Sequence, residues 1–533
     1  MTSVKLNDDL QEAAIHPAFV VGIAIAALGS VYLGILAFWL YHPLLQFPDQ
    51  SMYLATAAML LDGKKLYVDM VDFNPPLITY LNLPAVVIAR AFHIPSPLAF
   101  ALFLLGLILV SLLVSGYLLF KDRKAPDAYC YIPFLLGYLF ISKELVLDFG
   151  QREHLLIITY LPFFVVRYLR WRGIEISRWI AIFAGLYAAV TLSLKPHFLL
   201  MAAAPELVFL LQTRKWKNLI APETISCALL GITYGAHLAV MDPEVKNRFF
   251  SFVVPLVKTG YDYYTVSFLK TISDFNRALT NSFILTLLVA LPLSRYCSLI
   301  APTAAFTVAA FGIYIVASQD WSHHWVPVQY GVLTLSWLIG AVLVRFLCSC
   351  APQSRLLNLY MSGTMCAAGL GYMTMLNLPH DMVFTNHFDM TQIGYKGQSP
   401  ADDVQPWAEK ILKYSKKGDP ILCISDAIAP GYPITLQTER RPASRYLHGM
   451  PLMMAKYLAW EKPRIKDRKK FEGFYNEIIE QYRQDIEKNK PTMIIVRESG
   501  IIEPLEKGGF FDIHLNNYKL VETFEGHRIY QRQ

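Results

Sequence analysis

Four groups of polar side chains in an otherwise apolar chain have the types and spacing for chemistry. The first group contains four carboxylates, Asp49, Asp62, Asp69 and Asp72. A carboxylate held at the edge of an apolar layer accepts a proton readily, as the general base for a hydroxyl must. Asp49, in the sequence Phe-Pro-Asp-Gln, is our candidate base. A helix N-cap explains Asp49 equally well and explains Asp62 better.

The second group is Asp-Phe-Gly-Gln-Arg-Glu-His at residues 148–154. Asp148, Arg152, Glu153 and an adjacent imidazole form a set that binds a divalent cation or a phosphate. The alternative is a solvated turn between two helices. Because ionisable residues at the boundary of a membrane span are expensive and tend to be functional, we treat this group as a candidate site.

The third and fourth groups are basic and lie near other apolar segments. Lys195 and His197, in Lys-Pro-His, provide a point charge and a donor for a lipid-linked phosphate. Lysine snorkelling to lipid head groups is the alternative for Lys195. His323 and His324 stand between two tryptophans, a pattern that suits phosphate or sugar binding. The indoles alone are equally consistent with an aromatic belt at a membrane surface.

The chain as a whole is too apolar for a soluble domain. Of its 533 residues, 54% are hydrophobic and only 17% are charged, and the mean hydropathy is +0.36. This composition indicates a polytopic membrane protein, which has membrane lipids as neighbours. The net charge is a modest +7, and the basic residues punctuate the apolar segments instead of forming one face. We therefore expect no nucleic-acid partner.

Apolar segments of roughly 20 residues, separated by short polar breaks, predict about eleven membrane-spanning helices. The predicted spans are 18–40, 97–120, 127–143, 154–170, 178–194, 197–212, 222–240, 278–294, 298–318, 329–347 and 357–377. Lys and Arg clusters in alternate breaks fall on one side, which the positive-inside rule makes cytoplasmic. All four candidate groups then lie on the opposite side, with the N-terminus cytoplasmic.

The opposite side also receives the first outer loop, residues 41–97, and everything after residue 378. In that loop, 51–61 and 77–92 predict helices lying in the membrane interface. Residues 258–264 form either a segment that covers the substrate or an interfacial anchor. Near residue 380 the composition becomes charged, and strands predicted at 420–425, 492–496, 519–523 and 528–531 alternate with amphipathic helices around 402–416 and 467–489. We therefore predict a transmembrane domain at 1–378 and a small α/β domain at 379–533.

Three features of the first outer loop together resemble one family. They are an aspartate just outside the first span, the segment Leu-x-Gly-x-x-Leu-Tyr-x-Asp at 61–69, and the Pro75-Pro76 pair before an interfacial helix. This loop is similar to that of the GT-C superfamily of glycosyltransferases. It is most similar to bacterial relatives of the protein O-mannosyltransferases and of the lipid A aminoarabinose transferase.

The resemblance implies a GT-C-like fold and a sugar donor linked to polyprenyl phosphate. It gives Asp49 the role of activating the acceptor, and it places the second acidic motif, Asp148 and Glu153, in the active site. Members of the family often have a second acidic residue directly after the first, where this chain has Gln50. A divalent cation is possible, because metal dependence varies within the superfamily. We assign Tyr67 and Asp72 to substrate binding, together with Arg152 and the basic residues of the third and fourth groups.

The sequence-based hypothesis is an inverting glycosyltransferase of the bacterial inner membrane that works on the periplasmic face. A cell-envelope glycan or lipid is the expected acceptor. A transporter or flippase for lipid-linked sugars is the rival, and it should carry polar residues deep within its spans. A polymerase or ligase of surface polysaccharide keeps the same chemistry with other substrates.

Overall fold

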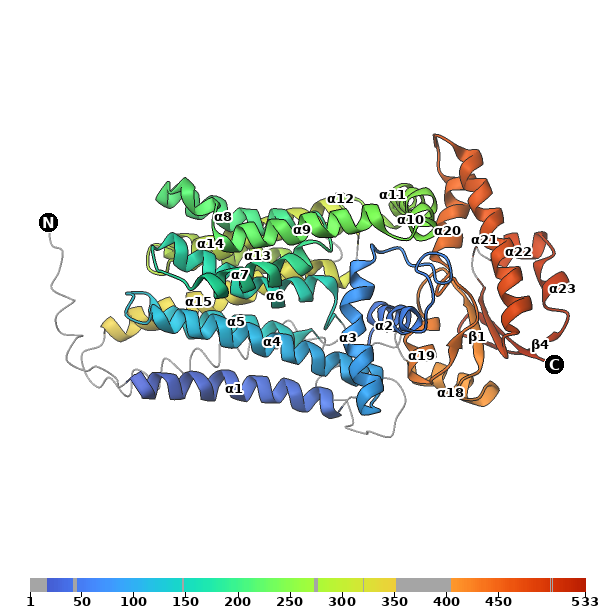
Figure 1. Cartoon of the computed structure of the whole chain (residues 1–533), viewed down its shortest axis with the longest axis horizontal. Coiled ribbons are helices and arrows are strands. Elements are labelled where there is room, and N and C mark those ends of the chain that lie inside the picture. The colour runs from blue at the N-terminus through green and yellow to red at the C-terminus, as the bar shows by residue number, and fades with distance from the viewer. Residues whose placement is uncertain are drawn as a thin grey trace.

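A bundle of long apolar helices forms most of the protein. The computed structural model describes residues 17–41, 46–145, 148–272, 277–319, 321–350, 404–498, 500 and 502–533. Figure 1 shows the bundle helices running side by side, with the C-terminal domain at one end. The bundle helices are α1 (Pro17–Tyr41), α4 (Ser96–Lys121), α5 (Tyr131–Glu144), α6 (Arg152–Trp171), α7 (Arg178–Leu192), α8 (Phe198–Thr213), α9 (Pro222–Val240), α13 (Arg277–Leu293), α14 (Ile300–Ala317) and α15 (Val326–Cys350).

The structure confirms as helices all the predicted spans that fall within the described residues. Span 222–240 coincides with α9, and the others differ from their helices by a few residues at the ends. Among the described residues, helices at 96–121, 216–240, 300–317 and 322–347 are long and apolar enough to cross a membrane alone, and six more are apolar but shorter. The chain is therefore a multi-pass membrane protein. The predicted span 357–377 and the predicted domain boundary at 378 lie outside the described residues.

Helix α6 is the centre of the bundle and carries part of the candidate site at its start. Nearly all of its side chains are buried, and it packs against α4, α7, α8 and α15. Because its neighbours surround it, its first residues, Arg152 and Glu153, are held away from lipid. The position of these two charges is therefore set by the whole bundle.

Two short helices of the first outer loop lie between the bundle and the C-terminal domain (Figure 1). They are α2 (Pro48–Leu61) and α3 (Leu77–Phe92), which pack against each other. Both were predicted as helices lying in the membrane interface. Residues 50–57 of α2 are instead buried in protein, because α3 and α19 (Gly431–Gln437) cover them. The exposed apolar side chains Val87 and Phe92 of α3 are consistent with the interfacial prediction for that helix.

The C-terminal domain is a mixed sheet of five strands with helices around it. The strand order is β2-β1-β3-β5-β4, in which β1 is parallel to β2 and β3, and β5 is antiparallel to β3 and β4. The elements are α18 (Val404–Tyr414), β1 (Pro420–Ile424), α19, β2 (Arg441–Pro442), α20 (Met450–Lys456), η8 (Tyr457–Glu461), α21 (Arg468–Asn489), β3 (Met493–Arg497), α22 (Ile502–Lys507), α23 (Phe510–His514), β4 (Tyr518–Phe524) and β5 (His527–Arg532). Four of these strands were predicted from the sequence, whereas β2, which is only two residues long, was not.

Residues 243–270, between the predicted spans 222–240 and 278–294, fold into short helical turns, part of which packs against the C-terminal domain. Its elements are α10 (Pro243–Arg248), η3 (Phe249–Val253), α11 (Val254–Gly260), η4 (Tyr261–Tyr264) and α12 (Phe268–Lys270). Helix α11 packs on α20, and Asp262 forms an ion pair with Lys462 at 2.6 Å. These contacts place Tyr261 at the junction of the bundle and the domain.

Basic residues predicted to be cytoplasmic gather at the end of the bundle where α4 and α6 finish. Arg172, directly after α6, forms ion pairs with Asp122 and Asp127. Arg167 and Arg170 both bind Glu223 at the start of α9. The four candidate groups come from the opposite ends of these helices, so the structure separates the two sets of charges as the alternating breaks predicted.

Candidate functional site

Asp49 lies in the first turn of α2 and reaches toward the second polar group. The N-cap of α2 is Phe47, and no side-chain hydrogen bond caps this described helix end. The N-cap alternative for Asp49 is therefore wrong. Its carboxylate instead accepts a hydrogen bond from Gln151 Nε2 at 2.8 Å. The positive end of the α2 dipole also favours a negative charge at this position.

A tight turn brings the second polar group to Asp49. Gly150 has φ +84°, and a Cβ there would lie 2.4 Å from the Phe100 ring, so the turn requires glycine. Gln151 follows this turn as the N-cap of α6 and donates to Asp49. Gln50, next to Asp49, donates to the Phe149 carbonyl at 3.2 Å. Gln50 occupies the position where the family that this loop resembles often has an acid. It thus joins the start of α2 to the turn before α6.

Arg152 is oriented by the first outer loop. Its guanidinium donates to the side-chain oxygen of Asn74, and the Asn74 amide donates to Asp72 at 2.9 Å. The Tyr67 hydroxyl donates to the Asn74 carbonyl at 2.6 Å. Burial raises the pKa of Asp72, which is 1% exposed. Tyr67 and Asp72 were predicted to bind substrate, and this stays a prediction; their contacts suit positioning of Asn74 and, through it, Arg152.

Lys195 and Glu153 form a buried ion pair. The Lys195 side chain is 12% exposed and that of Glu153 only 2%. Burial and the nearby charge of Arg152 lower the pKa of Lys195 to about 8, although Glu153 opposes the shift. The snorkelling alternative is wrong for this lysine, because its ammonium group binds a buried carboxylate. His197 lies at the margin, where its ring meets Phe198 edge-on, and burial lowers its pKa to about 4.

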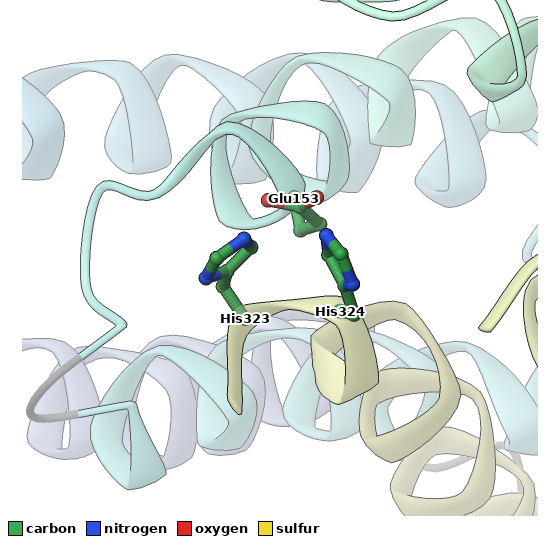
Figure 2. Close-up of side chains that lie close together, drawn as sticks. All are labelled: Glu153, His323 and His324. Atoms are coloured by element: carbon green, nitrogen blue, oxygen red, sulfur yellow. The ribbon is translucent and has the colours of Figure 1, made fainter. Parts of the chain in front are cut away.

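His323 and His324 lie in η6 (Ser322–Trp325), just before α15, and face Glu153 (Figure 2). Ligand atoms of the three residues all lie within 4.8 Å of one another. Glu153 Oε2, His323 Nε2 and His324 Nδ1 are buried and have no hydrogen-bond partner among the described residues. Ser322 donates to Asp148 at 3.0 Å, so η6 also contacts the second acidic group.

The negative charge of Asp49 influences the pKa of several of these groups. It contributes to the pKa of Asp148 and of Lys195, and to that of Tyr261 in η4. Glu153 likewise acts on Asp148 and on Lys195. The structure therefore brings members of all four polar groups together. Of the first group, Asp49 and Asp72 belong to this cluster, whereas Asp62 is the exposed C-cap of α2 and pairs with Arg90. His154 belongs to this stretch of sequence but bonds to Ser142 and to the Gly150 N–H, so it holds the turn.

Two neutral side chains that connect the charged ones were not predicted from the sequence. Gln151 links Asp49 to the start of α6, and Asn74 links Arg152 to the first outer loop. Neither carries a charge, and each sits where a turn or a helix start accounts for a polar residue. Only their partners on distant segments reveal their role.

Asp148 gives the fold a pH dependence that a substitution can test. Burial raises the pKa of Asp148 to about 7 from 3.8, with further contributions from Glu153 and Asp49. The folded state thus favours the neutral acid. The stability that protonated Asp148 contributes to the fold is fully present below about pH 4 and is lost as the pH rises through 7. We expect Asp148→Asn to leave the melting temperature unchanged near pH 4. Above pH 7 it should stabilise the protein by ~1 kcal/mol or more. Thermal unfolding in detergent across this pH range measures the difference, and a constant difference would contradict the assignment.

The trio of Glu153, His323 and His324 fits a divalent cation by its donor set. Two imidazoles and one carboxylate are the ligands of zinc sites that keep an open position. Burial and the absence of other partners among the described residues leave these ligand atoms available. Lys195 already pairs with the other oxygen of Glu153, so a cation would share this carboxylate with the ammonium.

We expect the purified protein to bind about one equivalent of Zn²⁺, measured by elemental analysis after dialysis. His323→Ala and His324→Ala should each lose most of the bound metal. His197→Ala, a nearby histidine outside the trio, is the control and should retain it. Equal metal content in all four proteins would contradict this site and leave His323 and His324 as direct phosphate donors.

The fold defines a polytopic membrane protein whose candidate polar groups gather at one end of the helix bundle. Its structure is similar to the crystal structure of ArnT from Cupriavidus metallidurans bound to undecaprenyl phosphate. The match has a TM-score of 0.56 and 12% identity, and it covers 96% of this chain and 97% of that one. The apo structure of the same ArnT matches with a TM-score of 0.48 and 13% identity, over 96% and 98% of the two chains.

The match to ArnT, a lipid A aminoarabinose transferase, confirms the predicted GT-C-like fold over nearly the whole chain. No protein-family model matches this sequence, and no curated protein matches it. The likeness therefore concerns the fold.

Proposed function

We propose that this protein transfers a sugar from a polyprenyl-phosphate donor to a hydroxyl group of a cell-envelope glycan or lipid. The observation that carries the proposal is the convergence of Asp49, Arg152 and Lys195 at one end of the bundle. The fold adds support, because the similar ArnT structure holds undecaprenyl phosphate. We place the reaction on the periplasmic face of the bacterial inner membrane, since the basic turns lie at the opposite end of the bundle.

In the proposed mechanism, Asp49 removes the proton from the acceptor hydroxyl as its oxygen attacks the anomeric carbon. The bond from that carbon to the phosphate oxygen breaks, and the electron pair leaves with the lipid phosphate. A single displacement of this kind inverts the anomeric configuration. Arg152 and Lys195 stabilise the charge that develops on the phosphate. A divalent cation held by Glu153, His323 and His324 would add positive charge there.

The surrounding residues keep these groups in place. Gln151 holds the Asp49 carboxylate, and Asn74 holds the Arg152 guanidinium. Glu153 keeps the ammonium of Lys195 in a buried position. Preorganised charges in a site shielded from water stabilise a transition state more strongly than mobile ones.

The rival function, transport of a lipid-linked sugar, predicts charged groups in the middle of membrane spans. Here the groups lie where helices begin. Arg152 is the first residue of α6, Lys195 lies between α7 and α8, and His323 lies in η6 before α15. This placement favours chemistry at one surface over passage through the bilayer.

The assay uses purified protein in lipid nanodiscs with a radiolabelled sugar on polyprenyl phosphate and envelope glycolipids as acceptor. We expect release of free polyprenyl phosphate together with label in the glycolipid fraction. The assay covers a range of donor sugars. Movement of the labelled lipid across a liposome membrane, without release of polyprenyl phosphate from any donor, would replace this proposal by a flippase.

A further inference from the structure

A segment of the C-terminal domain lies against the first outer loop, beside the candidate site. The Val71 N–H of the first outer loop donates to the Arg445 carbonyl at 2.7 Å, in a parallel bridge that pairs Val71 with Tyr446. The Arg445 side chain and N–H both bind Asp485 of α21, so the segment is anchored within its own domain. The first outer loop and the C-terminal domain are thus joined beside the site.

The next residues along this segment are held in a fixed place. A Cβ at Gly449 would lie 1.8 Å from the carbonyl oxygen of Ser425, directly after β1. Only glycine allows this approach, so the chain around His448 is pressed against the end of the sheet. The position of His448 is therefore determined by packing on both sides.

His448 is a buried polar side chain with an unused nitrogen. It is 2% exposed, and its ring meets Phe73 edge-on with centroids 5.1 Å apart. Its Nδ1 has no hydrogen-bond partner in the part of the chain that the structure describes. Burial lowers the pKa of His448 to about 4, and the charge of Asp49 opposes that shift. His448 is thus neutral at physiological pH and lies within the electrostatic reach of Asp49.

A continuous series of aromatic rings connects His448 to the double-histidine turn. Phe73 contacts Tyr261 at 6.4 Å, Tyr261 contacts Trp321 at 5.8 Å, and Trp321 stacks on His323 at 5.8 Å between centroids. We call Phe73, Tyr261, Trp321 and His448 the aromatic wall. Its members come from the first outer loop, from η4, from the segment before α15 and from the C-terminal domain. Aromatic faces beside polar groups suit the apolar faces and hydroxyls of a sugar.

We propose that His448 forms a hydrogen bond with a saccharide hydroxyl held against the aromatic wall beside Asp49, so that the C-terminal domain forms part of the active site. This inference rests on the proposed function, because it takes the ligand to be a sugar of the donor or of the acceptor. Buried polar atoms in folded proteins are nearly always hydrogen-bonded, and a substrate hydroxyl would satisfy His448. His448 is in these terms a substrate-positioning residue.

The test compares His448→Phe with His448→Gln in the full-length protein. Phenylalanine keeps an aromatic ring against Phe73 but removes the hydrogen bond, whereas glutamine keeps a donor and an acceptor. We expect His448→Phe to raise the KM for one substrate by roughly 3- to 30-fold, the effect of one lost hydrogen bond. His448→Gln should recover a substantial part of the affinity. A rise in the KM for the donor, or for the acceptor, identifies which sugar His448 holds.

His527→Phe is a matched control in the same domain. His527 is also a buried histidine with a ring edge-on to an aromatic neighbour, Trp407, and with one nitrogen that lacks a partner among the described residues. It lies in β5, and its other ring nitrogen contacts the carbonyl of Glu525. We expect this variant to leave both KM values unchanged. Unaltered KM values in His448→Phe, or equal changes in both variants, would overturn the proposal.

A binding measurement separates this inference from the proposed function. The probes are polyprenyl phosphate with and without an attached sugar, titrated into wild type and His448→Phe. If wild type transfers no sugar, the proposed function fails. Selective loss of affinity for the sugar-bearing lipid still supports His448, as the residue that holds the donor sugar. If wild type transfers sugar and neither this affinity nor either KM changes, only the inference about His448 fails.

Discussion

Replacing Asp49 by asparagine should lower the rate of sugar transfer by ~10²- to 10⁴-fold, the usual contribution of a general base. Asparagine has nearly the same size, and its side-chain oxygen still accepts the hydrogen bond from Gln151. The substitution thus removes the proton acceptor and leaves the contact between the two loops. The measurement is the initial rate of polyprenyl phosphate release at saturating donor and acceptor, with thermal unfolding as a check on folding.

Asp62→Asn is the matched control for this prediction. Asp62 belongs to the same loop, but its carboxylate is exposed and forms an ion pair with Arg90 at the C-terminal end of α2. We expect the control variant to keep the wild-type rate. Undiminished transfer by Asp49→Asn would remove Asp49 from the mechanism, and equal losses in both variants would point to a general effect on the loop.

Lys195→Met should affect stability and catalysis together. Removing one member of a buried ion pair leaves the other charge uncompensated and destabilises a protein by ~3–5 kcal/mol. Glu153, at 2% exposure, is the group left unpaired. We also expect a loss of turnover of ~100-fold or more, because Lys195 is one of two cations proposed to stabilise the departing phosphate. Apparent melting temperature and turnover measure the two effects.

The double variant Lys195→Met with Glu153→Gln separates the effect on stability from the effect on turnover. It removes both charges, so we expect it to recover most of the lost stability while turnover stays low. The pH dependence gives a second readout, because the lowered pKa of Lys195, about 8, makes its positive charge disappear above that pH. Wild-type turnover should therefore fall as the pH rises past 8, and this decrease should be absent in both variants. A fully active double variant would exclude Lys195 from phosphate stabilisation.

Much of the architecture could be predicted from the order of residues alone. Helix α9 follows its predicted span to the residue, because a run of apolar residues that must cross a bilayer can satisfy its backbone only as a helix. The separation of Arg172 from Lys195 to opposite ends of the bundle followed from counting crossings. Both predictions depend on the free energy of transferring short segments from water into lipid. That free energy is set by the local composition of each segment.

The contacts inside the site depended on tertiary structure. The sequence indicated Asp49, Asp148, Glu153, Lys195 and the histidine pair as separate groups on one side of the membrane. It did not reveal that Gln151 holds Asp49, that Glu153 pairs with Lys195, or that Tyr67 and Asp72 hold Asn74. Each of these contacts joins side chains whose distance and direction are set by turns such as the one at Gly150.

The C-terminal domain illustrates the same limit most clearly. Its composition predicted a small α/β domain beside the site, and nothing in the order of residues placed His448 near Asp49. That placement required the bridge between Val71 and Tyr446 and the close approach of Gly449 to the sheet. The sequence by itself thus determined which elements form and which polar residues lie at the same end of the bundle, because hydrophobic transfer acts on each segment separately. Only the packing of those segments decided which polar groups meet, because a hydrogen bond or ion pair requires both partners to arrive within a few ångströms in the right orientation.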